Sequence, residues 1–133
     1  MRNAIVCVML ASAVAAFAAP CTPKVDHRKI DQTAIQNIQK NKVNSGKELW
    51  RLDAKEVAAR EAAALDSAYK GAPEKTPVQS VKAEDKLQVF RYKSAAGATY
   101  EITMKKFEWL LPYSGIYKMM AWTVTDVKTT CGK

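Results

Sequence analysis

Hydrophobic and polar residues follow three different patterns along the chain. Residues 4–19 are almost all apolar or small, with no charge among them. Between residues 30 and 72, apolar side chains recur at intervals of three and four, the spacing of an amphipathic helix. From residue 76 onward apolar and polar residues alternate, and β-branched and aromatic residues become frequent, which favours strands. This order predicts helices followed by a sheet.

Two predicted helices carry start and stop signals. The first, over 31–44, begins at Asp31, whose carboxylate can accept a hydrogen bond from a free backbone N–H of the first turn. The second, over 53–70, begins with a capping box that pairs Asp53 with Glu56, and a glycine follows each helix as a stop signal. Alanine fills the second helix, so a neighbouring layer can approach it closely. We expect that layer to be the sheet.

Alternation predicts four strands separated by short turn sequences. They cover residues 78–82, 87–93, 99–107 and 117–127. The pattern is clean in the last strand, where Met120, Trp122 and Val124 share one face. If the alternation continues, Asp126 also faces the core, and its carboxylate would need a partner there.

Helices followed by consecutive strands predict an α+β domain, because short turns between neighbouring strands produce antiparallel pairs. The expected fold is a set of N-terminal helices packed on a curved antiparallel sheet of about four strands. In the order of its elements this fold resembles the cystatin-like and NTF2-like rolls, and no sequence motif contributes to that resemblance. Rolls of this kind host unrelated functions, so the resemblance implies an architecture and no activity.

The apolar N-terminus has the order of a secretory signal peptide. One early positive charge precedes the apolar run, and residues 16–18, Ala-Phe-Ala, match the small-residue pattern of a cleavage site. Cleavage after Ala18 would remove residues 1–18 and leave residues 19–133 as a single α+β domain. The alternatives are a lipoprotein signal with Cys21 as the lipidated residue, and an uncleaved anchor. We expect an exported protein, periplasmic or secreted, with no transmembrane segment in the mature chain.

The cysteines support the same interpretation. Cys7 would leave with the signal peptide, and two cysteines would remain, Cys21 and Cys131, one at each end of the domain. In an oxidising compartment such a pair predicts a disulfide that ties the two ends together. Two free thiols or a bond between two chains are the alternatives.

The net charge of the chain favours one class of binding partner. The whole chain has a formal net charge of +8, and without Arg2 the mature part keeps 20 Lys and Arg against 13 Asp and Glu, a formal charge of +7. This excess favours anionic partners, such as acidic proteins, phosphorylated glycolipids or acidic polysaccharides. Nucleic acid would produce the same signature, but export and the lack of a recognised binding motif disfavour it.

No combination of residues identifies a catalytic or metal site. The mature chain has one histidine, His27, in the leader before the first helix, and a lone histidine there is most often solvated. The sequence therefore does not supply the residues that a nucleophilic triad or a zinc site needs. Two carboxylates on strands, Glu101 and Asp126, are most simply interpreted as solvated or salt-bridged groups. We predict no catalytic residue, no metal and no cofactor, which favours a non-enzymatic protein.

The segment 105–120 carries bulky apolar residues where a simple hairpin connection would carry polar ones. Core packing explains part of this composition if Trp109, Leu110 and Leu111 fold back over the sheet. The functional interpretation is a protruding rim that anchors a partner, since aromatic residues near basic ones are typical of interface hot spots. The candidate partner-binding residues are Trp109, Leu111, Tyr113, Tyr117, Lys105 and Lys106.

Two functions from different classes fit these features. The first is an exported, non-enzymatic binding or accessory protein of the cell envelope or extracellular space, which engages a protein or an anionic surface. The second is a small-ligand-binding or enzymatic roll with its site in the concavity between the second helix and the sheet. An exposed aromatic rim would support the first, and a cavity with an unpaired polar group the second. The candidate lining residues of such a cavity are Tyr92, Tyr100, Trp122 and Asp126.

Overall fold

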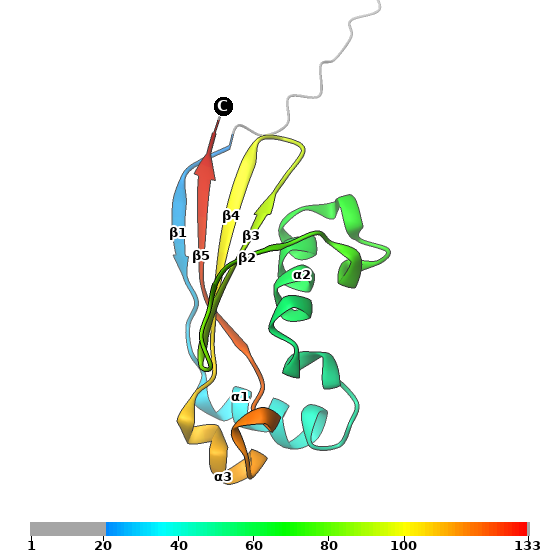
Figure 1. The fold of residues 1–133 in the computed structure, drawn as a ribbon, viewed down its shortest axis with the longest axis vertical. Helices are drawn as coiled ribbons and strands as arrows, with labels where there is room; N and C mark the ends of the chain where they lie inside the picture. Colours follow the sequence, from blue (N-terminus) through cyan, green and yellow to red (C-terminus); the bar gives the residue numbers. More distant parts are fainter. Residues whose placement is uncertain (1–20, 133) are drawn as a thin grey trace, which may run out of the picture.

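Five antiparallel strands form one open sheet in the order β1-β5-β4-β3-β2 (Figure 1). The computed structural model describes residues 21–132, so the predicted signal peptide over 1–18 lies outside the described residues. Helix α2 covers one face of the sheet, and the short helices α1 and α3 lie together at one end (Figure 1). The strands are β1 (Lys24–His27), β2 (Gln79–Ala83), β3 (Leu87–Lys93), β4 (Ala98–Lys105) and β5 (Thr123–Cys131). The α+β class is therefore confirmed.

The number of strands is a correction to the sequence prediction, which expected about four. The additional strand is β1, in the segment that the sequence analysis treated as a leader. All four of its residues are exposed. Because neither face of this strand is buried, its sequence need not alternate between apolar and polar residues, and the pattern gives no sign of a strand. The strand is defined by backbone pairing to β5, with Lys24 opposite Thr129 and His27 opposite Asp126.

The last strand begins at Thr123, six residues later than predicted. Before it, the chain forms a 3₁₀ turn (Glu108–Leu110), helix α3 (Leu111–Ser114) and a second 3₁₀ turn (Tyr117–Met119). Gly115 ends α3 with a φ of +81°, a conformation that favours glycine. This helical connection and the residues that follow it replace the first six residues of the predicted strand.

The helix start signals are confirmed. Asp31 caps α1 (Gln32–Ile38), and the chain continues as a π-helical turn (Gln39–Val43) to near the predicted end. Helix α2 (Ala54–Leu65) begins at Asp53, whose carboxylate accepts from the backbone N–H of Lys55 at 3.0 Å and of Glu56 at 3.4 Å.

Helix α2 ends five residues before the predicted position. Asp66 leaves the helix in an extended conformation, and its carboxylate caps a new 3₁₀ turn, Ser67–Tyr69, by accepting from the Ala68 N–H at 3.2 Å. An acidic residue with a short side chain can bond to its own downstream backbone, and that bond competes with continuation of the helix.

The main core lies between α2 and the sheet. Small residues on α2, including Ala58 and Ala62 with no exposed surface, allow the helix to pack closely on large side chains of the strands. A smaller core at the helical end joins Ile35, Leu110 and Met120. The main core consists of Ala54, Val57, Ala58, Ala62, Phe90, Tyr92, Ile102, Met104, Trp122 and Val127.

A buried amide fastens α1 to the chain that leads into β5. The Gln39 side chain is fully buried, and its Nε2 donates to the carbonyl of Met119 at 2.7 Å. Its Oε1 accepts from the backbone N–H of Ala121 at 2.8 Å. A buried amide with both ends bonded stabilises this junction, whereas a buried amide left unpaired would destabilise it.

The expected inward direction of Asp126 is wrong, and a β-bulge is the reason. The register between β4 and β5 shifts so that Met104 lies opposite Val124, whereas Thr103 lies opposite Asp126, and Thr125 is the extra residue. One extra residue reverses the alternation beyond it. Val124 therefore faces α2, and Asp126 points to the opposite face. No described helix covers that face, which is called the uncovered face here (Figure 1).

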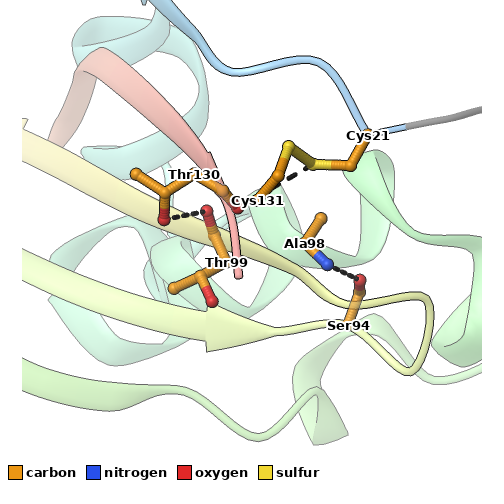
Figure 2. The surroundings of a disulfide bond; sticks show 6 residues. All are labelled: Cys21, Ser94, Ala98, Thr99, Thr130 and Cys131. Atoms are coloured by element: carbon orange, nitrogen blue, oxygen red, sulfur yellow. Dashed lines mark hydrogen bonds between the residues drawn. A yellow bond between two sulfur atoms is a disulfide. The ribbon is translucent and has the colours of Figure 1, made fainter. Parts of the chain in front are cut away.

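The predicted disulfide between Cys21 and Cys131 is present, with the two Cα atoms 5.8 Å apart (Figure 2). It joins the start of the β1 segment to the last residue of β5. Beside it, the β3–β4 hairpin turns at Ser94, whose hydroxyl accepts from the Ala98 N–H at 3.0 Å. None of the helices within residues 21–132 has the length and apolarity needed to cross a membrane.

Replacing Cys131 with Ser should destabilise the oxidised protein strongly. The bond closes a loop with a sequence separation of 110 residues, and the lost constraint on the unfolded chain corresponds to about 4–5 kcal/mol. Urea denaturation of wild type and C131S, each with and without a reductant, measures the effect. The reduced wild type should match the variant, and an equal loss of stability in both redox states would contradict the prediction.

Candidate functional site

Exposed apolar side chains concentrate at the helical end of the molecule. Among the described residues seven large apolar side chains are exposed, and three of them lie within residues 113–117. These three, Tyr113, Ile116 and Tyr117, are called the aromatic rim here. Their exposed fractions are 37%, 56% and 45%. A cluster of this kind on a small surface indicates a contact site, whereas single exposed apolar residues are ordinary.

The rim is held by the short helices rather than by a flexible loop. Tyr113 belongs to α3, and its carbonyl accepts from Nδ2 of Asn44 at 2.8 Å. Tyr117 begins the following 3₁₀ turn, and its carbonyl accepts from Nζ of Lys106 at 3.0 Å. Both aromatic residues therefore sit on backbone that is fixed from elsewhere in the fold.

Lysine side chains lie against both tyrosine rings of the rim. Nζ of Lys40 is 5.2 Å from the centre of the Tyr113 ring, and Nζ of Lys86 is 4.5 Å from that of Tyr117. Lys86 also forms an ion pair with Glu108. The hydrogen bond in this pair raises the pKa of Lys86 and lowers the pKa of Glu108, so both groups are charged at neutral pH.

The remaining partner-binding candidates have different environments. Trp109 and Leu111 are half-buried against the smaller core, and the Trp109 ring stacks on Phe107 with centres 4.9 Å apart. Lys105 is exposed at the end of β4, and Lys106 is half-buried over the ring of Trp122, where burial lowers its pKa. Thus Tyr113 and Tyr117 remain as exposed anchors, and Trp109 and Leu111 support them from beneath.

Ile116 is the member of the rim that sequence reasoning missed. In the sequence it lies in the connection that leads into the predicted last strand, where one apolar residue carries no special signal. The Pro112 and Gly115 pair, a proline at the start of a short helix and a glycine at its end, could have revealed the helical turn that exposes it.

A cavity of about 550 Å³ lies at the opposite end of the molecule, beside the disulfide. Its walls come from the C-terminal end of α2, the β3–β4 hairpin and strands β1, β4 and β5. The position is part of the concavity between α2 and the sheet that the sequence analysis proposed. The lining residues that matter to its chemistry are Lys24, Asp66, Tyr100 and Thr129.

Strand register brings three of these side chains into one row. Lys24 lies opposite Thr129, Thr129 opposite Tyr100, and Tyr100 opposite Tyr92. Paired residues of antiparallel strands point to the same face, so the whole row faces α2. The Tyr92 and Tyr100 rings stack with centres 6.3 Å apart.

Asp66 is oriented over this row from the end of α2. Its Oδ2 accepts from the hydroxyl of Tyr92 at 2.7 Å, and its Oδ1 accepts from the Ala68 N–H. Burial raises the pKa of Tyr92, and the hydrogen bond to Asp66 raises it further, so the phenol stays protonated and donates at any physiological pH.

The four predicted lining residues are dispersed by the fold. Tyr100 lines the cavity, and Tyr92 is buried beside it with its hydroxyl on Asp66. Trp122 is buried near the other end of α2, and Asp126 lies on the opposite face of the sheet. Sequence reasoning missed Lys24, Asp66 and Thr129 because β1 is not apparent in the sequence, α2 ends earlier than predicted, and β5 extends beyond the predicted end at residue 127.

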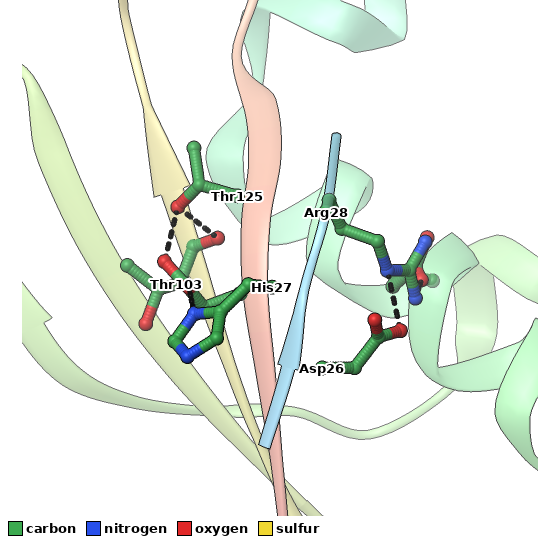
Figure 3. Close-up of polar contacts among 7 residues, drawn as sticks. Asp26, His27, Arg28, Thr103 and Thr125 are labelled. Carbon is green, nitrogen blue, oxygen red and sulfur yellow. Dashed lines mark hydrogen bonds and ion pairs between the residues drawn. The ribbon is translucent and has the colours of Figure 1, made fainter. Parts of the chain in front are cut away.

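On the uncovered face, His27, the single histidine in the sequence, meets the carboxylate of Asp126. Nδ1 of His27 lies 2.5 Å from Oδ1 of Asp126, and the Thr125 hydroxyl donates to Oδ2 at 2.8 Å (Figure 3). The His27 side chain is 78% exposed. The hydrogen bonds from His27 and Thr125 lower the pKa of Asp126.

Next to His27, Arg28 joins the N-terminal segment to α2. Its Nε donates to Asp26 at 2.9 Å (Figure 3). The other end of the guanidinium forms an ion pair with Glu61 of the helix. The His27–Asp126 and Arg28 contacts together hold the N-terminal segment in place. Within residues 21–132, no group of three or more His, Cys, Asp and Glu side chains is arranged to hold a metal ion.

No protein-family model matches the chain, and no curated protein or solved structure gives a significant match.

Replacing Asp126 with Asn should reduce the loss of stability in acid. Because folding lowers this pKa from its ordinary value of 3.8, the carboxylate stabilises the fold above that pH, and the contribution is lost as the pH falls through the lower, folded-state value. The free energy of unfolding of D126N should therefore fall less than that of wild type between about pH 5 and pH 2. The control is E74Q, an exposed carboxylate after α2, and an identical pH dependence of D126N and wild type would contradict the prediction.

Proposed function

We propose that this chain is an exported, non-enzymatic accessory protein that docks on an anionic surface of the cell envelope through the aromatic rim. The observation that carries the proposal is the exposure of Tyr113, Ile116 and Tyr117 beside lysines at one end of the molecule. The rim offers two amphipathic rings and one aliphatic side chain on a fixed backbone.

The charge near the rim supports an anionic partner. Lysines outnumber carboxylates there: Glu108 is already paired with Lys86, and Lys40, Lys42 and Lys118 make no ion pair among the described residues. Positive residues close to an anionic bilayer contribute about 1 kcal/mol each, over a range limited by salt screening.

The kinds of side chain in the rim support an interfacial site rather than a large protein interface. Tyrosine places its ring among apolar groups and its hydroxyl in water, and lysine extends its charged end toward headgroups while its stem covers apolar surface. An aliphatic residue such as Ile116 adds a small apolar area that becomes buried when the rim contacts the surface. Combined with basic residues, such a set gives reversible, salt-dependent attachment.

The disulfide supports the export part of the proposal. Such bonds persist in oxidising compartments and are rare in the cytosol. An exported basic protein meets the anionic lipids and polysaccharides of the envelope before any nucleic acid, which is the physical reason for naming this class of surface.

Replacing the two rim tyrosines should weaken attachment without unfolding the protein. The double variant Y113S/Y117S should bind vesicles rich in phosphatidylglycerol roughly tenfold more weakly than wild type, because partly exposed rings lose their buried area at the interface. Sedimentation with the vesicles measures the affinity, and thermal unfolding checks the fold. The matched control is V81S, since Val81 is exposed to the same fraction as Tyr117, 45%, but lies on β2; equal binding of both variants would overturn the proposal.

In the same assay, a lysine close to the aromatic rim should contribute more to vesicle binding than a distant one. K118Q should weaken binding about fivefold, the equivalent of about 1 kcal/mol, whereas K75Q, far from the rim, should have a smaller effect. Wild-type protein should not bind vesicles of phosphatidylcholine alone. Failure to bind anionic vesicles, with saturable binding to a purified acidic protein instead, would overturn the choice of an envelope surface.

A further inference from the structure

We propose that the cavity beside the disulfide binds a small zwitterion of the amino-acid class, with the ligand's ammonium group at Asp66, its carboxylate at Lys24 and its side chain against Tyr100. The site is separate from the aromatic rim, which lies at the other end of the molecule (Figure 1). It does not depend on the proposed docking function.

The size and walls of the cavity suit a small ligand. Its volume of about 550 Å³ falls within the range of roughly 300–1,000 Å³ that is typical of ligand pockets. The apolar part of the wall comes from Leu65, the Tyr100 ring and small residues, which are Ala95, Ala96 and Ala98. Small side chains from the hairpin leave the space open, and the disulfide fixes the edge (Figure 2).

Asp66 is prepared to receive a cation. The hydrogen bonds from the Tyr92 hydroxyl and the Ala68 N–H orient the carboxylate, and an ionised carboxylate has about four acceptor positions, so acceptor capacity remains. Asp66 has no basic partner among the described residues. An ammonium group would make the charge-assisted hydrogen bonds that the free protein does not supply.

Lys24 supplies the opposite charge across the same cavity. It lies on the helix-facing side of β1, opposite Thr129, and forms no ion pair within residues 21–132. Lysines elsewhere on the strands, such as Lys93, Lys105 and Lys128, also make no ion pair within residues 21–132, so what distinguishes Lys24 is its place in the cavity wall together with Asp66. One unpaired anion and one unpaired cation in one cavity favour a ligand that carries both charges over a simple cation or anion.

Thr129 gives an independent sign of an unmet interaction. Only 6% of this residue is exposed, and its hydroxyl oxygen is buried without a hydrogen-bond partner among the described residues. Native proteins rarely leave such a group unpaired. Because Thr129 lines the cavity between Lys24 and Tyr100, rotation of its side chain toward a bound ligand would let the hydroxyl bond to the ligand carboxylate.

The test compares three related probes by calorimetry and by NMR shifts of the Ala95 and Ala96 amides. Leucine carries both charges, leucinamide only the ammonium and N-acetylleucine only the carboxylate. Leucine should bind at least tenfold more tightly than the other two probes. Absence of saturable leucine binding, or equal affinity for all three, would overturn the proposal.

Two charge variants should affect different probes. In D66N the amide oxygen can still accept from the Ala68 N–H, and the amide nitrogen can donate to the Tyr92 hydroxyl. D66N should weaken leucine and leucinamide at least tenfold but not N-acetylleucine. K24Q should weaken leucine and N-acetylleucine but not leucinamide. The matched controls are D85N, in the β2–β3 turn, and K128Q, on the opposite face of the sheet; equal effects of K24Q and K128Q would overturn the assigned contacts.

A third variant separates ligand binding from stability. T129V removes a buried unpaired hydroxyl, so the ligand-free protein should unfold at the same or a higher temperature than wild type. Its affinity for leucine should nevertheless fall several-fold. Loss of stability with unchanged leucine affinity would show that Thr129 has a structural role and takes no part in binding.

Discussion

The covalent bond between Cys21 and Cys131 holds the N-terminal segment along the last strand, and the arrangement of both faces of the sheet depends on that placement. Strand β1 has four exposed residues and contributes little apolar burial, so backbone pairing, the disulfide and the Arg28 contacts keep it in position. Once β1 is placed, Lys24 faces α2 at the cavity, and His27 meets Asp126 on the uncovered face.

The alanine face of α2 determines where the space between the helix and the sheet is filled by side chains and where a cavity remains. Along the helix, small side chains interlock with Phe90, Ile102 and Met104, and the core is closely packed. The helix ends at Leu65, before it reaches the disulfide end of the sheet. Beyond that point none of the helices within residues 21–132 covers Tyr100 and Thr129, which leaves the cavity with Asp66 at its edge. The helical end, by contrast, is closed by its own small core, and its surplus apolar residues face outward.

The candidate sites depend on tertiary details that short sequence patterns do not contain. The extra residue Thr125 reverses the direction of Asp126. The sequence shows a break in alternation there, since Val127 rather than residue 126 is the next apolar residue after Val124, but one such break does not distinguish a bulge from the end of a strand. Similarly, Asp66 reads as an ordinary helical residue until its side chain is seen to cap the following turn. In each case the local sequence permits two directions or conformations for one residue, and contacts with residues far away in the chain select one of them.

The amino-acid sequence by itself determined the α+β class, the starts of α1 and α2, the position of β3 and the disulfide pair, because caps, alternation and cysteine number are local or countable signals. Only the tertiary structure decided that β1 is a strand, that residues 108–119 form short helices, and that Lys24, Asp66 and Thr129 share a cavity. Those features arise from backbone pairing and side-chain contacts between distant residues, from 26 positions apart for Asp66 and Tyr92 to 99 for His27 and Asp126. Such contacts depend on the register and the ends of elements, and local patterns fix neither.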